Sequence, residues 1–157
     1  MASGLFPRQF DNDYRGQRFA LALLAPIVLM KAAMGANAFL NTRFVIAIAD
    51  KIPLDTFSPG AKEAIVFMYQ AWGLCLFLLS ALGVLALIRY RSMVPLMFLI
   101  LGAENIVRRA LHLVDPFSFA QSGGLPSTGA LINYALIGGL IVGFISSLTP
   151  RRGGKRA

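Results

Sequence analysis

Residues 64–88 read AIVFMYQAWGLCLFLLSALGVLALI and contain no charged residue. An α-helix rises about 1.5 Å per residue, so this stretch is long enough to cross the roughly 30 Å hydrocarbon core of a bilayer. A helix that is apolar on every face at this length is typical of a membrane span. The stretch therefore predicts an integral membrane protein.

The composition of the whole chain agrees with this prediction. Of its 157 residues, 57% are hydrophobic and 14% are charged, whereas a soluble domain carries about a quarter charged residues. The formal charge of +8 is high enough to suit nucleic acid, but the basic residues lie beside apolar runs rather than on a soluble amphipathic face. We therefore expect membrane lipid around the chain and no nucleic-acid partner.

Further apolar runs place the other helices. The sequence predicts an all-α bundle of four transmembrane helices with a short interfacial segment between the first two. Ser58 followed by Pro59 predicts the start of the second helix, because serine caps free amides and proline suits the first turn. The predicted division is an N-terminal tail at 1–18, a transmembrane domain at 19–149 with spans at about 19–41, 64–88, 93–114 and 129–149, and a basic tail at 150–157.

The beginning of the chain has a second interpretation. Basic residues, an apolar stretch and Ala36-Asn37-Ala38 also fit the three regions of a secretory signal peptide. The apolar stretch is interrupted by Lys31, however, and the leading tail is long and contains acids. These features favour a retained first helix.

Orientation is predicted from the distribution of Lys and Arg. The N-terminal tail has three, the connection between the second and third helices has two, and the C-terminal tail has four. The first connection has three that are balanced by Asp50, Asp55 and Glu63, and the third connection has none. Basic residues gather on the cytoplasmic side of membrane proteins, so we expect both termini to be cytoplasmic.

Ionisable residues inside the predicted spans are the candidates for function, because each costs roughly 2.5–3.5 kcal/mol to insert. Lys31 lies 12 residues into the first predicted helix and Glu104 lies 11 residues into the third. Both therefore lie roughly 16–18 Å from the cytoplasmic side. This matched depth predicts an ion pair that lets the two charges neutralise each other, although other pairings remain open.

The third predicted helix extends this pair into a polar seam. Glu104, Arg108 and His112 follow at four-residue steps and share one face, and Asn37 and Asn41 of the first helix are amides able to satisfy an arginine. The seam is either a binding site for an amphipathic ligand, or a proton or ion relay, or a structural network whose arginines reach the outer surface. It consists of Lys31, Asn37, Asn41, Glu104, Asn105, Arg108, Arg109 and His112.

The last predicted helix carries Ala135, Gly139, Gly143 and Ser147 at four-residue steps. Small residues on one face allow close approach of another helix. Internal packing and docking on another membrane subunit both remain open.

Motifs for soluble-type catalysis are not found in the sequence. It contains no Gly-rich phosphate loop, His-Glu-x-x-His pattern, paired cysteines or nucleophile elbow. His112 alone, near a helix end and without a partner motif, gives little support for a haem or chlorophyll ligand. We assign no catalytic residue and no metal site, and no cofactor is implied by a motif.

Several segments carry a family resemblance. Ile52-Pro53-Leu54-Asp55, the turn Ile88-Arg89-Tyr90-Arg91, and the run from Pro95-Leu96-Met97 to Glu104 resemble small uncharacterised bacterial inner-membrane proteins with four helices, some of them DoxX-like. The resemblance covers most of the chain. It implies a multi-pass protein of the bacterial inner (cytoplasmic) membrane and, from the DoxX-like proteins, an accessory role beside membrane oxidoreductases.

Three functions follow as hypotheses. The first is a non-catalytic accessory or assembly subunit of a larger respiratory or photosynthetic membrane complex, with other membrane subunits or a second copy of this chain as partner. The second is a membrane-embedded binder or enzyme for a lipid, quinone or other apolar small molecule at the seam. The third is a small oligomeric transporter, for which the sequence offers no inverted repeat.

Overall fold

The computed structural model describes residues 5–7, 9–50, 52–114 and 128–150, with side chains omitted at 112–114 and 128–130. Within these ranges the chain forms helices and turns and no strand. The predicted loop at 115–127 and the basic tail from residue 151 onward lie outside the described residues. An all-α fold is confirmed for the part described.

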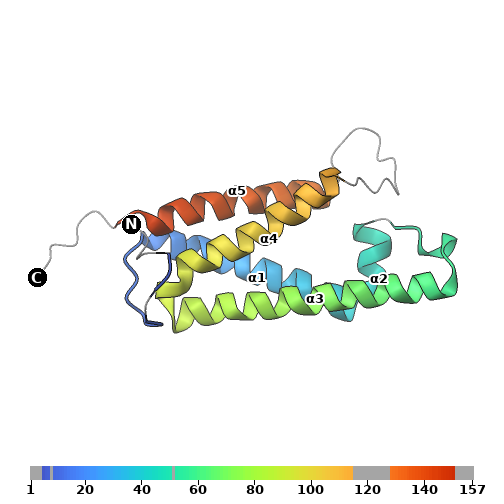
Figure 1. Ribbon diagram of the computed structural model, residues 1–157, viewed down its shortest axis with the longest axis horizontal. Coiled ribbons are helices and arrows are strands. Elements are labelled where there is room, and N and C mark those ends of the chain that lie inside the picture. Colours follow the sequence, from blue (N-terminus) through green and yellow to red (C-terminus); the bar gives the residue numbers. More distant parts are fainter. Residues whose placement is uncertain (1–4, 8, 51, 115–127, 151–157) are drawn as a thin grey trace, which may run out of the picture.

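Four long helices run in alternating directions along the long axis of the molecule (Figure 1). α1 packs most extensively against α3 and also contacts α5, while α4 packs mainly on α5. α4 leaves α3 after the turn that joins them and ends beside α5 (Figure 1). The long helices are α1 (Arg18–Leu40), α3 (Pro59–Ile88), α4 (Val94–Val114) and α5 (Thr128–Leu148).

Three helices of the described chain, rather than the predicted four, are long and apolar enough to cross a membrane. They are α1, α3 and the part of α5 at 131–148. α4 has the necessary length, at 21 residues, but its apolar sequence is interrupted by Glu104, Arg108 and Arg109. Composition and length therefore confirm three of the four predicted spans.

The ends of the helices follow the local signals in the sequence. Ser58 caps α3, its side-chain oxygen accepting a hydrogen bond from the Ala61 amide at 3.4 Å, and Pro59 occupies the first turn. η4 (Arg91–Met93) makes the tight turn into α4, where Pro95 lies in the first turn. The predicted start of the second helix is thus confirmed.

The connection between α1 and α3 folds into short helical pieces beside the first turns of α3 (Figure 1). The Thr42 hydroxyl donates to the Ala38 carbonyl at 2.7 Å, and Ile46 is fully buried. The pieces are α2 (Thr42–Phe44), the π-helical η2 (Val45–Ala49) and the 3₁₀ turn η3 (Leu54–Thr56).

The apolar core occupies the half of the molecule that contains the α3–α4 turn. It is built from the first half of α1, the end of α3, the first half of α4 and the middle of α5. Its buried members include Leu24, Val28, Val94, Phe98 and Leu140. The other half of the molecule holds the charged residues of the predicted seam.

Two glycines set the close approach of α1 to α3. A Cβ on Gly35 would lie 2.6 Å from the backbone nitrogen of Phe77, and a Cβ on Gly73 would lie 2.7 Å from the backbone nitrogen of Phe39. Both distances are shorter than the contact distance of non-bonded heavy atoms. Hence any larger residue at either position pushes the two helices apart.

The predicted small-residue face of α5 is largely used inside the chain. Gly143 is buried against the ring of Phe98 in α4, and a Cβ on Gly139 would lie 3.4 Å from the Ile27 side chain in α1. Ser147 is also buried, whereas Ala135 is exposed. For three of the four positions, packing within the chain accounts for the small residue.

The described part of the predicted N-terminal tail is held against the α3–α4 turn. The Ser92 amide and hydroxyl donate to the Asp11 carbonyl at 3.2 and 3.0 Å, and the Asp11 amide donates back to the Ser92 hydroxyl. The Gln17 amide donates to the Ser146 carbonyl near the end of α5. This segment therefore links the start of α1 to two other helix ends.

Tyr14 in this segment leads to a prediction about pH. Its hydroxyl donates to the Gln17 carbonyl at 3.2 Å, and burial raises the pKa of Tyr14 to about 12. The folded state keeps the proton longer than the unfolded state, so this contribution to stability is complete below about pH 10 and is lost as pH rises toward 12. In thermal unfolding at about pH 9 and about pH 11, Tyr14→Phe should lose less stability on alkalinisation than the parent. Equal losses would contradict this role.

Candidate functional site

The predicted ion pair joins α1 to α4. The Lys31 Nζ lies 2.5 Å from Oε2 of Glu104, and the Lys31 side chain is only 2% exposed. Burial of an ammonium without a partner is costly, and here the carboxylate supplies that partner. The structure contains the contact that the matched depth of the two residues suggested, among the pairings that the sequence left open.

Arg108 extends the pair toward α5. Its Nε donates to the second carboxylate oxygen of Glu104 at 3.1 Å, one helical turn away. Its Nη2 donates to the side-chain oxygens of Asn105 and Asn133, each at 3.0 Å. Asn133 lies in α5, so a single guanidinium ties α4 to α5.

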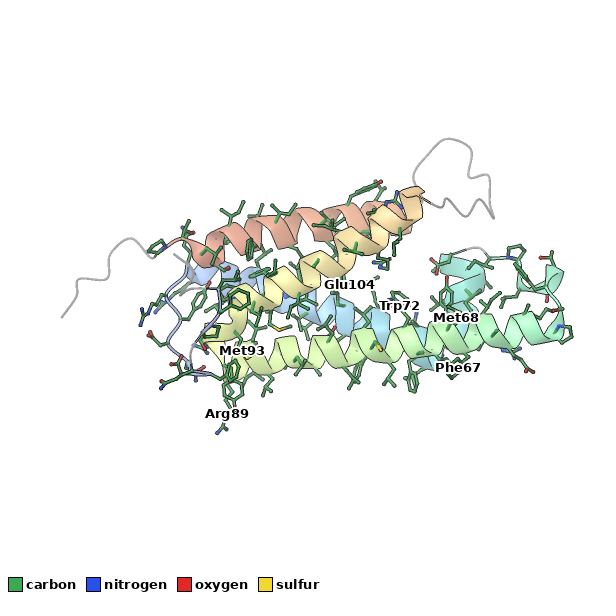
Figure 2. All side chains as sticks on the ribbon, viewed as in Figure 1. Phe67, Met68, Trp72, Arg89, Met93 and Glu104 are labelled. Atoms are coloured by element: carbon green, nitrogen blue, oxygen red, sulfur yellow. The ribbon has the colours of Figure 1, made fainter. Side chains whose placement is uncertain are left out.

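Aromatic residues of α3 complete the site on its other side. The Arg108 guanidinium carbon lies 5.5 Å from the centre of the Trp72 ring, within the range of a cation–π interaction. Tyr69 packs edge-on against Trp72, and its hydroxyl donates to Asp50 at 2.8 Å. Figure 2 shows Glu104 and Trp72 on the facing sides of α4 and α3. The site thus reaches from α1 to the α1–α3 connection.

We call the residues that meet here the polar cluster. They come from all four long helices, and two of them, Trp72 and Asn133, were not predicted from the sequence. Asn133 lies 15 residues before the end of α5 and Arg108 lies 14 residues after the start of α4. The matched depth that identified the ion pair thus applies to this contact as well. The members of the polar cluster are Lys31, Trp72, Glu104, Asn105, Arg108 and Asn133.

The structure does not bring Asn37 and Asn41 to the polar cluster. Both are exposed, and the Asn41 amide donates to the Asn37 side-chain oxygen at 2.9 Å. Asn37 follows Lys31 by six residues, which is roughly 240° around a helix of 3.6 residues per turn. It therefore lies on another face of α1, and the amides that satisfy Arg108 come from Asn105 and Asn133 instead.

Arg109 lies beside the polar cluster rather than within it. Its Nη2 donates to the Tyr134 hydroxyl at 2.6 Å, and its guanidinium carbon is 5.0 Å from the Tyr134 ring centre. Its Nε is buried and has no hydrogen-bond partner among the described residues. The His112 side chain, also predicted for the seam, lies outside the described part.

The polar cluster is buried at one end and open at the other. The exposed fraction of the side chain rises from 2% at Lys31 to 23% at Glu104 and 39% at Arg108. Within the described residues no group of three or more His, Cys, Asp or Glu is placed to hold a metal ion. The polar cluster can therefore pair with a charge and donate hydrogen bonds beside the Trp72 ring.

A separate groove of about 570 Å³ lies between the connection and the first turns of α3. Its charged lining residues are Arg43, Asp55, Lys62 and Glu63, of which Lys62 and Asp55 form an ion pair at 3.2 Å. The two positive and two negative charges of this groove cancel, whereas in the polar cluster Lys31 and Arg108 share one carboxylate. This groove contains none of the residues predicted for the seam.

Comparison with known proteins gave no match to a family model, to a curated protein or to a solved structure. The resemblance to DoxX-like proteins drawn from the sequence therefore stays a prediction.

Proposed function

We propose that this protein is a membrane-embedded binding protein for an amphipathic molecule, whose polar end contacts the polar cluster. The observation that carries the proposal is the rise in exposure from Lys31 through Glu104 to Arg108, together with the aromatic ring at its open end. A structural network whose arginines reach the outer surface would show the same rise, and the feature that favours a ligand is the partly buried Trp72 ring beside the guanidinium. Here the open end carries the guanidinium and lies beside Trp72.

The proposal includes α4 as a fourth membrane crossing. Its 21 residues correspond to about 31 Å of helix, and its neighbours α3 and α5 are both candidate spans. Glu104 contacts α1 and Arg108 contacts α5, so both charges have partners on other helices. The bacterial inner membrane and cytoplasmic termini, inferred from resemblance and from basic residues, belong to the same proposal.

The apolar part of such a ligand has a surface available on α3. Met68 lies four residues before Trp72, so the two side chains share one face of the helix. Met68 is 69% exposed, and thioether side chains adapt their shape to apolar partners. Figure 2 labels Met68 and Trp72 along α3 near the end where the connection folds back. An acyl or isoprenoid chain extending from Arg108 would pass along this face.

The test is identification of the amphipathic molecules that accompany the purified protein. The parent chain, extracted in mild detergent, should carry one such molecule in a fixed ratio by mass spectrometry. Arg108→Gln should weaken binding by roughly tenfold to a hundredfold and lower this occupancy, since charge-assisted hydrogen bonds contribute about 1.5–3 kcal/mol. Arg43→Gln removes the same charge from an exposed residue outside the polar cluster and should leave occupancy unchanged.

Either of two results would overturn the proposal. The first is a parent protein that carries no amphiphile in fixed ratio; the second is unchanged occupancy in a folded Arg108→Gln variant. The same purification tests the accessory-subunit hypothesis, which requires other proteins in fixed ratio. The feature that suggested a protein partner, the small-residue face of α5, makes contacts within the chain.

A further inference from the structure

The polar cluster has more positive than negative charge. Lys31 and Arg108 share a single carboxylate, that of Glu104. Arg109, next in the chain, adds a further positive charge, and its partner Tyr134 is a neutral hydroxyl. Among the described residues no second carboxylate forms an ion pair with any of these three cations.

The two arginines also have donors that the described chain does not use. Arg108 donates through Nε and Nη2, and its Nη1 makes no hydrogen bond with the residues described. The Arg109 Nε is buried and without an acceptor. Buried donors without acceptors are uncommon in folded proteins, because each one costs free energy.

A charge without a counter-charge is costly inside a membrane protein, and an oxyanion brought by a ligand removes that cost. Guanidinium groups match carboxylate and phosphate oxygens in geometry as well as in charge. We infer that the head group bound at the open end of the polar cluster is an oxyanion, a carboxylate or a phosphate ester, attached to an apolar chain. This inference rests on the proposed binding function and narrows its ligand.

A neutral head group fits these observations less well. A quinone carbonyl or a sterol hydroxyl accepts a hydrogen bond, but it leaves the excess positive charge in place. Arg108 also lies against the Trp72 ring, whose face attracts the guanidinium without neutralising it. The excess positive charge of the polar cluster therefore favours an anionic head group over a neutral one.

The chain contains one tryptophan, Trp72, so its intrinsic fluorescence reports directly on this site. The full-length protein in a neutral detergent is titrated with oleate, with oleoyl lysophosphatidate and with oleyl alcohol. Oleate and the lysophosphatidate should each give a saturable change in emission. Oleyl alcohol, which has the same chain and no charge, should need about tenfold higher concentration or more, equivalent to about 1.4 kcal/mol. The tighter of the two anions distinguishes a fatty acid from a phospholipid as the source.

Variants test whether the Arg108 guanidinium causes the preference for a charged head group. Arg108→Gln should bring oleate and oleyl alcohol to equal affinity, while Arg43→Gln should keep the difference between them. If Arg108→Gln does not fold, as judged by circular dichroism and gel filtration, the parent comparison of oleate with oleyl alcohol decides alone.

The failures of the two proposals can be told apart. Equal binding of oleyl alcohol and oleate by the parent would overturn the anionic head group and leave the binding function standing. If none of the three probes changes the emission and no amphiphile accompanies the purified protein, the binding function itself is overturned.

Discussion

Glu104→Ala is expected to lower the free energy of unfolding by about 3–5 kcal/mol, because it removes the carboxylate that neutralises a buried lysine. Lys31 is 2% exposed and donates to Glu104, and the same carboxylate also accepts from Arg108. Removing it leaves two neighbouring cations facing each other. The measurement is thermal or denaturant unfolding in detergent, followed by circular dichroism.

The matched comparison is the double variant Lys31→Ala with Glu104→Ala. It removes both charges of the ion pair, so it should be less destabilised than Glu104→Ala alone. Glu63→Ala provides the surface control, since Glu63 is exposed and forms no ion pair with a described residue, and it should change stability by less than about 0.5 kcal/mol. Strictly additive losses at Lys31 and Glu104 would contradict the coupling.

Gly35→Ala is expected to destabilise the protein by about 2 kcal/mol or more, the upper part of the range for overpacking. The added Cβ would lie 2.6 Å from the backbone nitrogen of Phe77, and a backbone atom cannot rotate away as a side chain can. Gly73→Ala should act in the same direction from the opposite helix. Thermal unfolding of the purified variants in detergent measures both effects.

Gly138→Ala is the control for this substitution. Gly138 also lies within a helix, α5, but a Cβ there would meet no atom within 4 Å. Alanine favours helix over glycine by about 1 kcal/mol, so this variant should be as stable as the parent or slightly more stable. If Gly35→Ala and Gly138→Ala behave alike, the close contact of α1 with α3 is not important for stability.

Some features of the fold and site were predictable because they depend on distances along the chain. Apolar runs and the Ser58-Pro59 signal placed the helices, and the depth of Lys31 and Glu104 in their helices predicted their contact. Helices of fixed rise convert a sequence interval into a depth. The number of apolar spans is the exception, since charges inside α4 separate it from the others.

Other features depend on which faces of two helices meet, and the sequence does not specify this. Small residues are common in apolar helices, so Gly35 and Gly73 did not stand out from the glycines of α5. The partners of Arg108 on α3 and α5 depend on the rotation of three helices about their axes. Asn37 and Asn41 lie at a suitable depth, but they are not on the face of α1 that carries Lys31.

The division of the molecule into an apolar half and a charged half implies uneven cooperativity. The side chains of the apolar core pack together around the α3–α4 turn, so we expect amide hydrogens there to exchange only when the whole domain unfolds. In the charged half, α4 has left α3, and fewer apolar contacts oppose a local fluctuation. On the proposed function, the ligand would enter beside Trp72 through sub-global opening, while the apolar half stays folded and keeps the helices in register.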